Sequence, residues 1–445
     1  MTPSMELGQQ LPIWMLIPFA MMLLCVAIFP IVFKHWFESN LNKAIVSVVL
    51  GVPVVIYLVV AFGSLGWEMV GSTAEEYLQF IVLLLALFAI SGGIYISGNL
   101  LGTPLVNLTI LAIGAVLANL IGTMGASMVL IWPLLRANYE RKYSVHTVIF
   151  FIFVVSNAGG LLTPLGDPPL FLGFLRGVPF QWTLQLWPQW LLSVGLLLIV
   201  YTAFEIWMYR KEPLSYRRFD IEQHEPLRIT GLLNVLILLL VIVTTLLSSY
   251  LSEIGEHLHF PLIREVIFII LIIISVKIAP HAPRVANQFT WVPIVEVAVL
   301  FAGVFATMIP ALAIMEARGS ALGLSQPWQY FWLTGGLSGF LDNAPTYLTF
   351  SSVIMGEVGV SDVGGLTTAA TGADAVFSPA YFLQAISCGA VMMGAFTYIG
   401  NAPNLTVKCI AQNFGVKMPS FLGYMFYSAL VLLPIYVVVT LVFFL

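Results

Sequence analysis

Apolar residues run along this chain in stretches long enough to cross a lipid bilayer, and short polar segments separate them. A helix needs about 20 mostly apolar residues to cross the hydrocarbon core. Ten stretches meet this requirement, at residues 12–33, 44–63, 78–97, 147–175, 187–209, 230–250, 261–279, 293–315, 379–413 and 421–445. Two more, at residues 105–135 and 328–356, are each about 30 residues long and are interrupted by Gly, Pro and polar residues. The pattern predicts an all-α polytopic membrane protein.

Composition narrows the class of protein further. Of the 445 residues, 60% are hydrophobic and only 9% are charged, whereas a soluble domain has about 25% charged residues. The 17 Lys and Arg against 21 Asp and Glu leave no basic field for nucleic acid. Cys25, Cys388 and Cys409 lie in apolar stretches without paired spacing, which argues against a disulfide framework or a metal site. The lipid bilayer is therefore the first partner that we expect.

The Lys and Arg residues indicate how the two long interrupted stretches lie. Cytoplasmic loops carry most of the positive charge in such proteins. If both stretches are re-entrant hairpins, every basic residue except Arg176, Arg264 and Arg318 falls on one side, whereas a single crossing would split them. We expect about ten transmembrane helices plus two re-entrant hairpins that enter from opposite sides, with both termini outside. Residues 1–11 lack the basic region of a cleavable signal, and a bacterial inner membrane is the expected location.

The parts of the chain on either side of the hydrophilic segment 210–228 resemble each other in order. The matching segments are Leu-Phe-Ala at 87–89 and 300–302, NLIGT at 119–123 and DNAPT at 342–346, and TPLGDPPL at 163–170 and TYIGNAPN at 397–404. The expected topology gives the two parts opposite orientations. The predicted organisation is N-terminal helices (1–75), a first inverted repeat (76–209), a cytoplasmic linker (210–228) and a second repeat with its scaffold helices (229–445).

Inverted repeats with paired broken helices are typical of secondary transporters, and the breaks indicate the binding site. The stretches 147–175 and 379–413 are interrupted in this way. Such breaks bring free backbone groups to the middle of the membrane, where they survive only against protein or a wet cavity. The polar side chains there offer oxygen ligands, without sulfur, histidine or basic groups, which suits hard alkali cations such as sodium. The candidate site residues are Asn119, Thr123, Ser156, Asn157, Thr163, Asp167, Asp342, Asn343, Thr346, Thr397, Asn401 and Asn404.

Asp167 and Asp342, one in each repeat, matter most among the candidates. A charged side chain at the bilayer centre costs about 2.5–3.5 kcal/mol on insertion scales and is functional by default. A buried carboxyl group can exchange a proton for a cation, so both are candidate sodium ligands. Each could instead cap the half-helix that follows it, because Asp is a favoured N-cap and Pro is favoured in the first turn. The Ser, Thr and Asn side chains could equally bond neighbouring helices.

At these residues the chain resembles the ion transporter superfamily of arsenite exporters, NhaD-type sodium/proton antiporters and sodium-coupled carboxylate carriers. SNAGGLLTPLGDPP (156–169) is similar to the broken helix of the NhaD-type antiporters, and LDNAPT (341–346) to their second hairpin. TYIGNAPN (397–404) is instead similar to the tip found in carboxylate carriers. The chain resembles most a branch of citrate transporters that are often labelled sodium/proton antiporters. The resemblance covers residues 76–445.

The resemblance implies a central site built from both repeats. Asn119, Thr123, Ser156, Asn157 and Asp167 would form one half of it. The other half would consist of Asp342, Asn343, Thr346, Thr397, Asn401 and Asn404. It also implies a homodimer with an elevator-like movement of the site.

Two transport functions fit these observations. The first is export of sodium or lithium in exchange for protons, with Asp167 and Asp342 alternating between cation and proton. The second is symport of citrate or a dicarboxylate with sodium or protons, which TYIGNAPN favours and the absence of a basic residue at the site opposes. Neither needs a cofactor beyond the transported ions. An intramembrane aspartyl protease would need Gly-x-Gly-Asp, but Pro164 replaces the first Gly, and no HExxH or GxSxG motif occurs, so we expect no enzyme.

Overall fold

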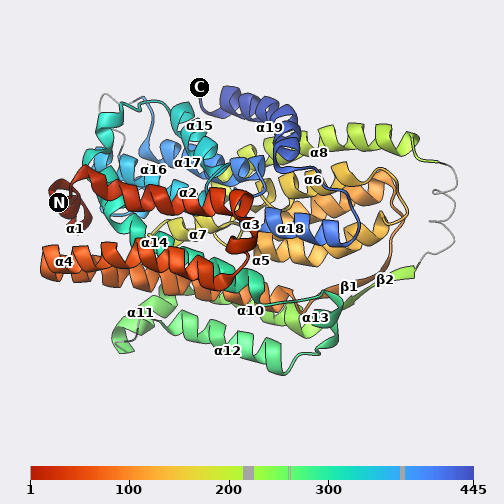
Figure 1. Ribbon diagram of the computed structural model, residues 1–445, viewed down its shortest axis with the longest axis horizontal. Coiled ribbons are helices and arrows are strands. Elements are labelled where there is room, and N and C mark those ends of the chain that lie inside the picture. The colour runs from red at the N-terminus through yellow and green to blue at the C-terminus, as the bar shows by residue number, and fades with distance from the viewer. Residues whose placement is uncertain (1, 214–224, 259, 261, 371–375) are drawn as a thin grey trace.

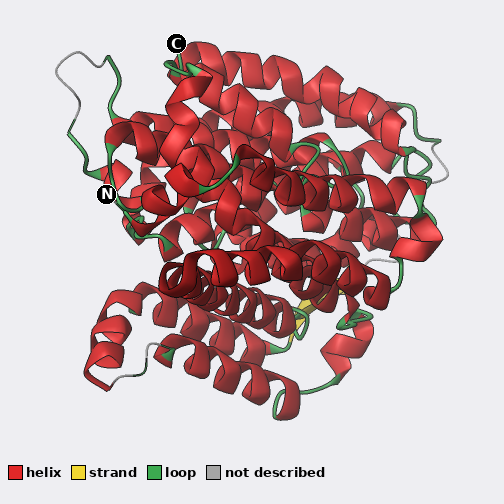
Figure 2. Ribbon diagram, turned by 60° about the vertical axis from the view of Figure 1, so that its left-hand side comes forward, coloured by secondary structure: helices red, strands yellow, loops and turns green. Residues whose placement is uncertain are grey.

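The computed structural model describes all residues except 1, 214–224, 259, 261 and 371–375. Most helices run along the long axis of the molecule (Figure 1), and helices form nearly all of its regular structure (Figure 2). In the described residues, eight helices are long and apolar enough to cross a membrane, or nine if one bent pair counts as a span. The expected all-α polytopic membrane fold is confirmed.

The N-terminal part leads into one long element, α4 (Asn40–Ser91), which is broken at Gly63. The two arms of α4 cover the expected span 44–63 and residues 78–91 of the expected span 78–97. They turn back on each other, because a Cβ on Gly66 would lie 2.1 Å from the backbone oxygen of Leu58. The preceding elements are α1 (Pro3–Gln10), η1 (Ile13–Met15), α2 (Leu16–Val32) and α3 (Lys34–Phe37).

The first expected hairpin is a helical hairpin in the structure. The element α5 (Pro104–Ala137) is broken at Gly122, whose φ of 76° is open to glycine and strained for other residues. Its two ends lie together, because the side chains of Asn107 and Asn138 exchange hydrogen bonds of 2.9 and 2.8 Å. The chain thus returns to the end of the bundle from which it came, with NLIGT at the tip.

The second expected hairpin consists of α15 (Pro327–Ser338) and α16 (Asn343–Val358), with residues 339–342 at its tip. The rings of Tyr330 in α15 and Phe350 in α16 are in contact, with their centroids 6.3 Å apart. The DNAPT segment lies at the start of the returning helix α16. NLIGT has the corresponding place in the first hairpin, where its glycine breaks α5.

Both stretches that the sequence predicts to be broken are broken. The first consists of α6 (Val145–Val154), η2 (Ala158–Leu162) and α7 (Pro168–Leu175). The second consists of α17 (Pro379–Met393), η6 (Gly394–Phe396) and α18 (Ala402–Asn413). In both, the helix restarts with proline in its first turn, where the missing amide hydrogen costs nothing.

The two hairpins open toward opposite ends of the bundle. We call the end that carries the base of α5 and residues 210–213 the linker end. His146, at the start of α6, lies 2.5 Å from Glu205 near this base. At the other end of the broken helix, the carbonyl of Arg176 accepts a hydrogen bond of 2.9 Å from the amide of Gly364, beyond the second hairpin. The first broken helix therefore runs from the base of one hairpin to the base of the other.

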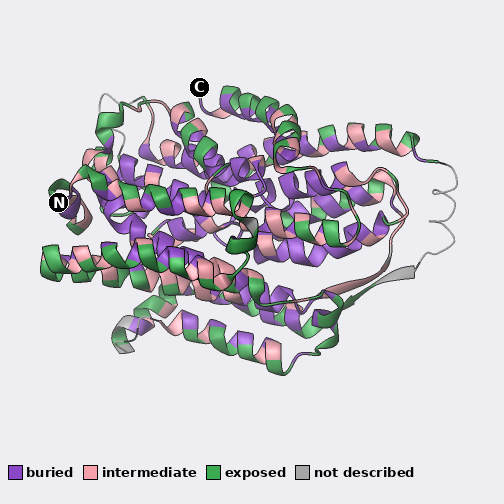
Figure 3. Cartoon of the chain, in the orientation of Figure 1, coloured by how far each residue is buried: buried purple, intermediate pink, exposed green. Residues whose placement is uncertain are grey.

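The remaining elements form the scaffold around these parts. They are η3 (Phe180–Leu186), α8 (Trp187–Arg210), α10 (Leu232–Leu246), α11 (Ser248–Leu258), α12 (Ile263–Lys277), α13 (Ala282–Ala286), α14 (Val292–Arg318), η4 (Gly319–Leu322), η5 (Gly364–Thr367) and α19 (Phe421–Phe443). Figure 3 shows buried residues concentrated in the middle of the bundle and exposed ones along outer helices such as α12 and α19. Exposed side chains of α19 include Leu422, Phe426 and Leu430, as a lipid-facing surface requires.

Three expectations about the spans are corrected. The expected span 230–250 is instead the pair α10 and α11, which bends by 65° between them. The helix α12 has 15 residues, about 22 Å at 1.5 Å per residue, so the expected span 261–279 is too short to cross a bilayer core alone. The expected helix 78–97 ends at Ser91, and β1 (Tyr95–Asn99) pairs antiparallel with β2 (Glu225–Thr230).

The paired strands explain why the second arm of α4 ends before residue 97. Gly92 and Gly93 follow α4, and glycine disfavours continuation of a helix. The end of the predicted linker takes part in β2, whereas its residues 214–224 lie outside the described residues. The boundary predicted at residue 75 falls inside the second arm of α4, and the division into repeats stays a prediction.

Candidate functional site

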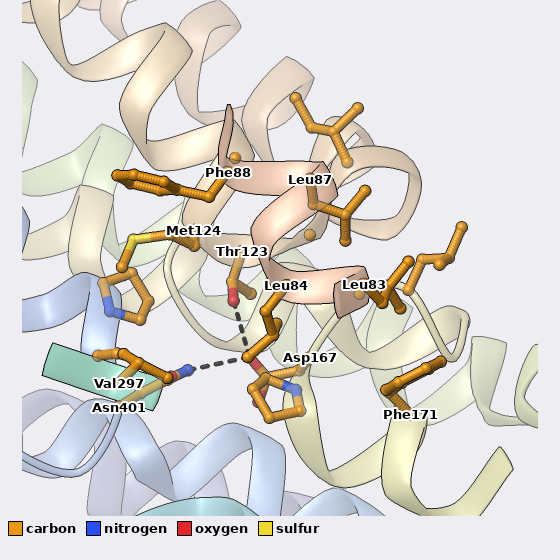
Figure 4. Close-up of a pocket in the computed structure, with 18 of the residues that line it drawn as sticks. Leu83, Leu84, Leu87, Phe88, Thr123, Met124, Asp167, Phe171, Val297 and Asn401 are labelled. Atoms are coloured by element: carbon orange, nitrogen blue, oxygen red, sulfur yellow. Dashed lines mark hydrogen bonds between the residues drawn. The ribbon is translucent and has the colours of Figure 1, made fainter. Parts of the chain in front are cut away.

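Asp167 lies where elements from both parts of the chain converge. Its Oδ1 accepts hydrogen bonds from the hydroxyl of Thr123, at 2.8 Å, and from Nδ2 of Asn401, at 2.9 Å, and Figure 4 shows both. Its Oδ2 accepts a hydrogen bond from Nδ2 of Asn343. Thr123 follows the break in α5, Asn343 begins α16, and Asn401 precedes α18. The carboxylate therefore joins the tips of both hairpins to the breaks of both helices.

Close backbone packing fixes the position of the first break. The amide of Thr123 donates to the carbonyl of Gly166 at 2.8 Å. A Cβ on Gly166 would come within 2.0 Å of the carbonyl oxygen of Gly160. The second break has the same arrangement, because a Cβ on Gly400 would lie 2.6 Å from the carbonyl oxygen of Gly394. Only glycine leaves room for the chain at both places.

Asp167 and Asp342 differ in whether their side chains cap the helices that follow them. Asp167 is the N-cap residue of α7, but its side chain makes no capping hydrogen bond, and both its oxygens bond other elements. Asp342 is the N-cap residue of α16, and its Oδ1 accepts a hydrogen bond from the amide of Ala344 at 3.2 Å. Asp167 is therefore not a simple cap, whereas Asp342 caps its helix and also lines a cavity beside Asp167.

Three of the candidate residues surround Asn401. Its Nδ2 lies 3.1 Å from the carbonyl oxygen of Ser156 and 3.3 Å from Oδ1 of Asn157. Asn157 donates in turn to Oδ1 of Asn404 at 2.7 Å, and Asn404 donates to the carbonyl of Gly394 at 2.9 Å. All of these side chains are buried. They hold the two breaks against each other behind the carboxylate.

The side chains of the other four candidates, Asn119, Thr163, Thr346 and Thr397, form hydrogen bonds with the backbone and not with Asp167. The hydroxyl of Thr163 donates to the carbonyl of Asn119 in the first hairpin. In the same way, the hydroxyl of Thr397 donates to the carbonyl of Gly339, at the tip of the second hairpin, at 2.6 Å. Thr346 bonds the backbone of its own helix, at 2.8 Å. For these residues the alternative of structural bonding fits the geometry.

A small cavity, which we call the site cavity, adjoins Asp167 (Figure 4). It encloses about 50 Å³, and Asp167, Asp342 and Asn401 line it among apolar side chains such as Leu87 and Phe171. A water molecule occupies about 10–15 Å³ of such a volume, so there is room for a few waters or a partly hydrated cation. The described residues of the lining include two acids and no Lys, Arg or His.

One buried polar atom beside Asp167 has no hydrogen-bond partner among the described residues. It is Oδ1 of Asn343, whose side chain is fully buried. An unsatisfied buried acceptor costs about 1–3 kcal/mol, so it calls for an explanation. It belongs to the amide whose Nδ2 bonds Asp167, and a cation or a proton held by that carboxylate would satisfy it. The described residues contain no group of His, Cys, Asp and Glu that could hold a resident metal ion.

Sequence reasoning missed a buried charged network at the linker end. Glu205 in α8 is fully buried and accepts hydrogen bonds from Arg141, at 3.2 Å, and from Asn107, at 3.0 Å. His146 lies 2.5 Å from the same carboxylate. Burial disfavours the charged form of Arg141, but its bond to Glu205 raises its pKa above the ordinary value. The only signal in the sequence is a glutamate inside an apolar stretch, which does not name its partners.

The comparison with known proteins agrees with this architecture. Residues 8–444 match a protein family described as "Putative citrate transport". No curated protein matches the chain. The family match includes both hairpins, both broken helices and Asp167, and it confirms the resemblance to the citrate-transporter branch. The chain therefore belongs to this family of membrane transporters.

Proposed function

We propose that this transporter exchanges sodium or lithium for protons, and that Asp167 binds the two in turn. The observation that supports this most directly is the set of partners of Asp167. The carboxylate is buried, and three neutral donors hold it, from Thr123, Asn343 and Asn401. A carboxylate buried without a basic partner is costly unless it binds a cation or takes up a proton. Alternation between these two states is cation/proton antiport.

Asn343 is suited to both states. While Asp167 is charged, Nδ2 of Asn343 donates to it, and a cation beside the carboxylate can use the free Oδ1 as a ligand. A protonated carboxyl group carries one O–H donor. Rotation of the amide then presents the same Oδ1 to that donor. Cation and proton compete for one carboxylate, and neither state leaves the amide oxygen unsatisfied.

Symport of citrate or a dicarboxylate with sodium or protons is the second candidate, and the family description favours it. The helices α7, α16 and α18 all begin near the site, and helix N-termini attract anions. The site cavity opposes it. Its volume of about 50 Å³ is small for a tricarboxylate, and its charged lining is acidic.

Purified protein in liposomes distinguishes the two candidates. The liposomes contain a pH-sensitive dye and carry an imposed proton gradient. We expect sodium or lithium added outside to change the internal pH, and potassium or citrate to leave it unchanged. Sodium-dependent uptake of labelled citrate, without a response to cations alone, would contradict antiport and establish the symporter.

Two controls make this assay specific. Liposomes without protein report the leak of ions and protons. The variant Glu68→Gln removes an exposed acid of α4 that does not line the site cavity, and should respond like the wild type.

A further inference from the structure

Three cavities lie in series between Asp167 and the linker end. The site cavity shares Asp342 and Asn401 with a second cavity, the middle cavity, which encloses about 110 Å³. The middle cavity shares Glu296 and Thr406 with a third, the linker-end cavity, of about 360 Å³. Because neighbouring cavities have lining residues in common, they adjoin one another along α14 and α18.

The third cavity lies beside the base of the first hairpin. Its lining includes Asn287 and Asn413. Asn287 donates to the carbonyl of Ile94, next to β1, at 2.7 Å. Phe414, which follows Asn413, contacts the ring of Tyr139 just after α5, with centroids 5.6 Å apart. These contacts place the cavity at the linker end.

The opposite end of the bundle has a cavity of its own. It encloses about 460 Å³, and Glu76, Arg176 and Asp362 contribute to its lining. It shares no lining residue with the site cavity. The row of adjoining cavities therefore leads from Asp167 to the linker end, and this other cavity does not adjoin the site cavity through any lining residue.

The charged groups along this series are all acidic. Asp167, Asp342 and Glu296 line the three cavities, and no described Lys, Arg or His does. Glu296 forms an ion pair of 2.9 Å with Lys43 of α4. The side chain of Lys43 is only 4% exposed, against 34% for Glu296, and it lies over the ring of Phe37. The carboxylate rather than the ammonium group therefore faces the open space.

We propose that Glu296 is the uptake residue for the transported cation, which passes from the linker end through the middle cavity to Asp342 and Asp167. This inference rests on the proposed cation transport. An acidic wall without basic groups concentrates cations in a narrow space. Lys43 holds Glu296 in place and neutralises it in part. That balance suits a transit site, because an ion must bind well enough to arrive and weakly enough to leave.

Thiol labelling tests the route without any transport assay. The probe is the Thr406→Cys variant, with Cys25, Cys388 and Cys409 replaced by alanine, because Thr406 lines both the middle cavity and the linker-end cavity. In the same background, Lys211→Cys marks the linker end.

The variant Glu68→Cys marks the opposite end, where the neighbouring Met69 lines the separate cavity. We expect a charged, membrane-impermeant maleimide to label the Thr406→Cys variant from the side that labels Lys211→Cys. Labelling only from the side that labels Glu68→Cys, or from neither side, would overturn the route.

A transport assay tests Glu296 itself. We expect Glu296→Gln to raise the KM for sodium about tenfold at low ionic strength, with little change at saturating sodium, since it removes the charge that concentrates the ion. This variant leaves Lys43 buried without its carboxylate. The double variant Lys43→Met/Glu296→Gln is therefore measured with it, because it removes both charges. We expect its KM to lie above the wild-type value and below that of Glu296→Gln, which also leaves an unpaired positive charge beside the cavity. Glu68→Gln is the matched control and should not change the KM.

The outcomes separate this inference from the proposed function. An unchanged KM in the double variant, with exchange lost in Asp167→Asn, would remove the role of Glu296 and leave antiport in place. No sodium response from the wild-type protein would contradict both. An increased KM in the double variant, together with labelling of Thr406→Cys from the linker end, would establish the uptake role.

Discussion

At the scale of single residues, the side chain of Asp167 connects the most elements. Its three partners come from α5, from the start of α16 and from the second break. A change at this position therefore affects both hairpins at once. Asp342 has a simpler role in the described contacts, because it caps α16 through the amide of Ala344.

The first prediction concerns the charge of Asp167. We expect Asp167→Asn to reduce cation-driven pH change in liposomes to the level of protein-free vesicles. The variant keeps the shape of the side chain but cannot exchange a proton for a cation. Its unfolding temperature in detergent should not fall, because replacing a buried charge with a neutral group removes a desolvation cost. Exchange at the wild-type rate would move the active carboxylate elsewhere.

The second prediction concerns the buried network at the linker end. Glu205→Gln leaves the guanidinium of Arg141 buried without its main carboxylate partner. Removing one member of a buried ion pair costs about 3–5 kcal/mol, so we expect a clearly lower unfolding temperature in detergent. Glu253→Gln, at an exposed position of α11, is the control. Equal unfolding temperatures in the two variants would show that the network does not stabilise the fold.

At the scale of elements, the two breaks depend on close approach of backbone segments. The third prediction therefore concerns Gly166. A Cβ there would lie 2.0 Å from the carbonyl oxygen of Gly160, so Gly166→Ala must displace the break and the neighbouring Asp167. We expect exchange to be lost and the unfolding temperature to fall. Gly71→Ala is the matched control, since a Cβ at Gly71 meets no atom within 4 Å. Retained exchange in Gly166→Ala would mean that the break can shift without loss of transport.

At the scale of elements, some breaks could be predicted from the residues beside them and others could not. The glycine in NLIGT and the prolines after Asp167 and Asn401 predicted the hairpin tip and both breaks, because these residues act on their own backbone. The bend between α10 and α11 was not predicted, since residues 232–250 contain no glycine or proline that would mark it. The pairing of β1 with β2 was missed because it joins segments far apart in the chain.

At the scale of the whole molecule, the bases of the two hairpins lie at opposite ends of the bundle. The fourth prediction follows from this arrangement. In cysteine-free protein, Tyr139→Cys, just beyond α5, and Asp362→Cys, beyond α16, should be labelled by an impermeant maleimide from opposite sides of the membrane. Both positions are exposed. Labelling from the same side would contradict the opposite orientation of the hairpins, and labelling of Tyr139→Cys from outside would reverse the predicted topology.

The outer surface of the bundle carries apolar side chains, but it does not test the expected homodimer or the expected location. Exposed apolar side chains such as Leu430 of α19 and Ile273 of α12 suit contact with lipid or with a second copy of the chain. The homodimer and the elevator-like movement that the resemblance implies stay predictions, as do the bacterial inner membrane and the position of the termini.

The sequence by itself determined the membrane class, the places where the helices break and the residue types gathered there. These properties follow from local composition, since apolar length, glycine and proline act on the segment that contains them. The tertiary structure decided which candidates meet. It gave Asp167 its partners Thr123, Asn343 and Asn401, placed Asp342 both as a cap of α16 and in the lining of the site cavity, and paired Glu205 with Arg141. Such contacts depend on how distant helices pack, and no local pattern along the chain encodes that geometry.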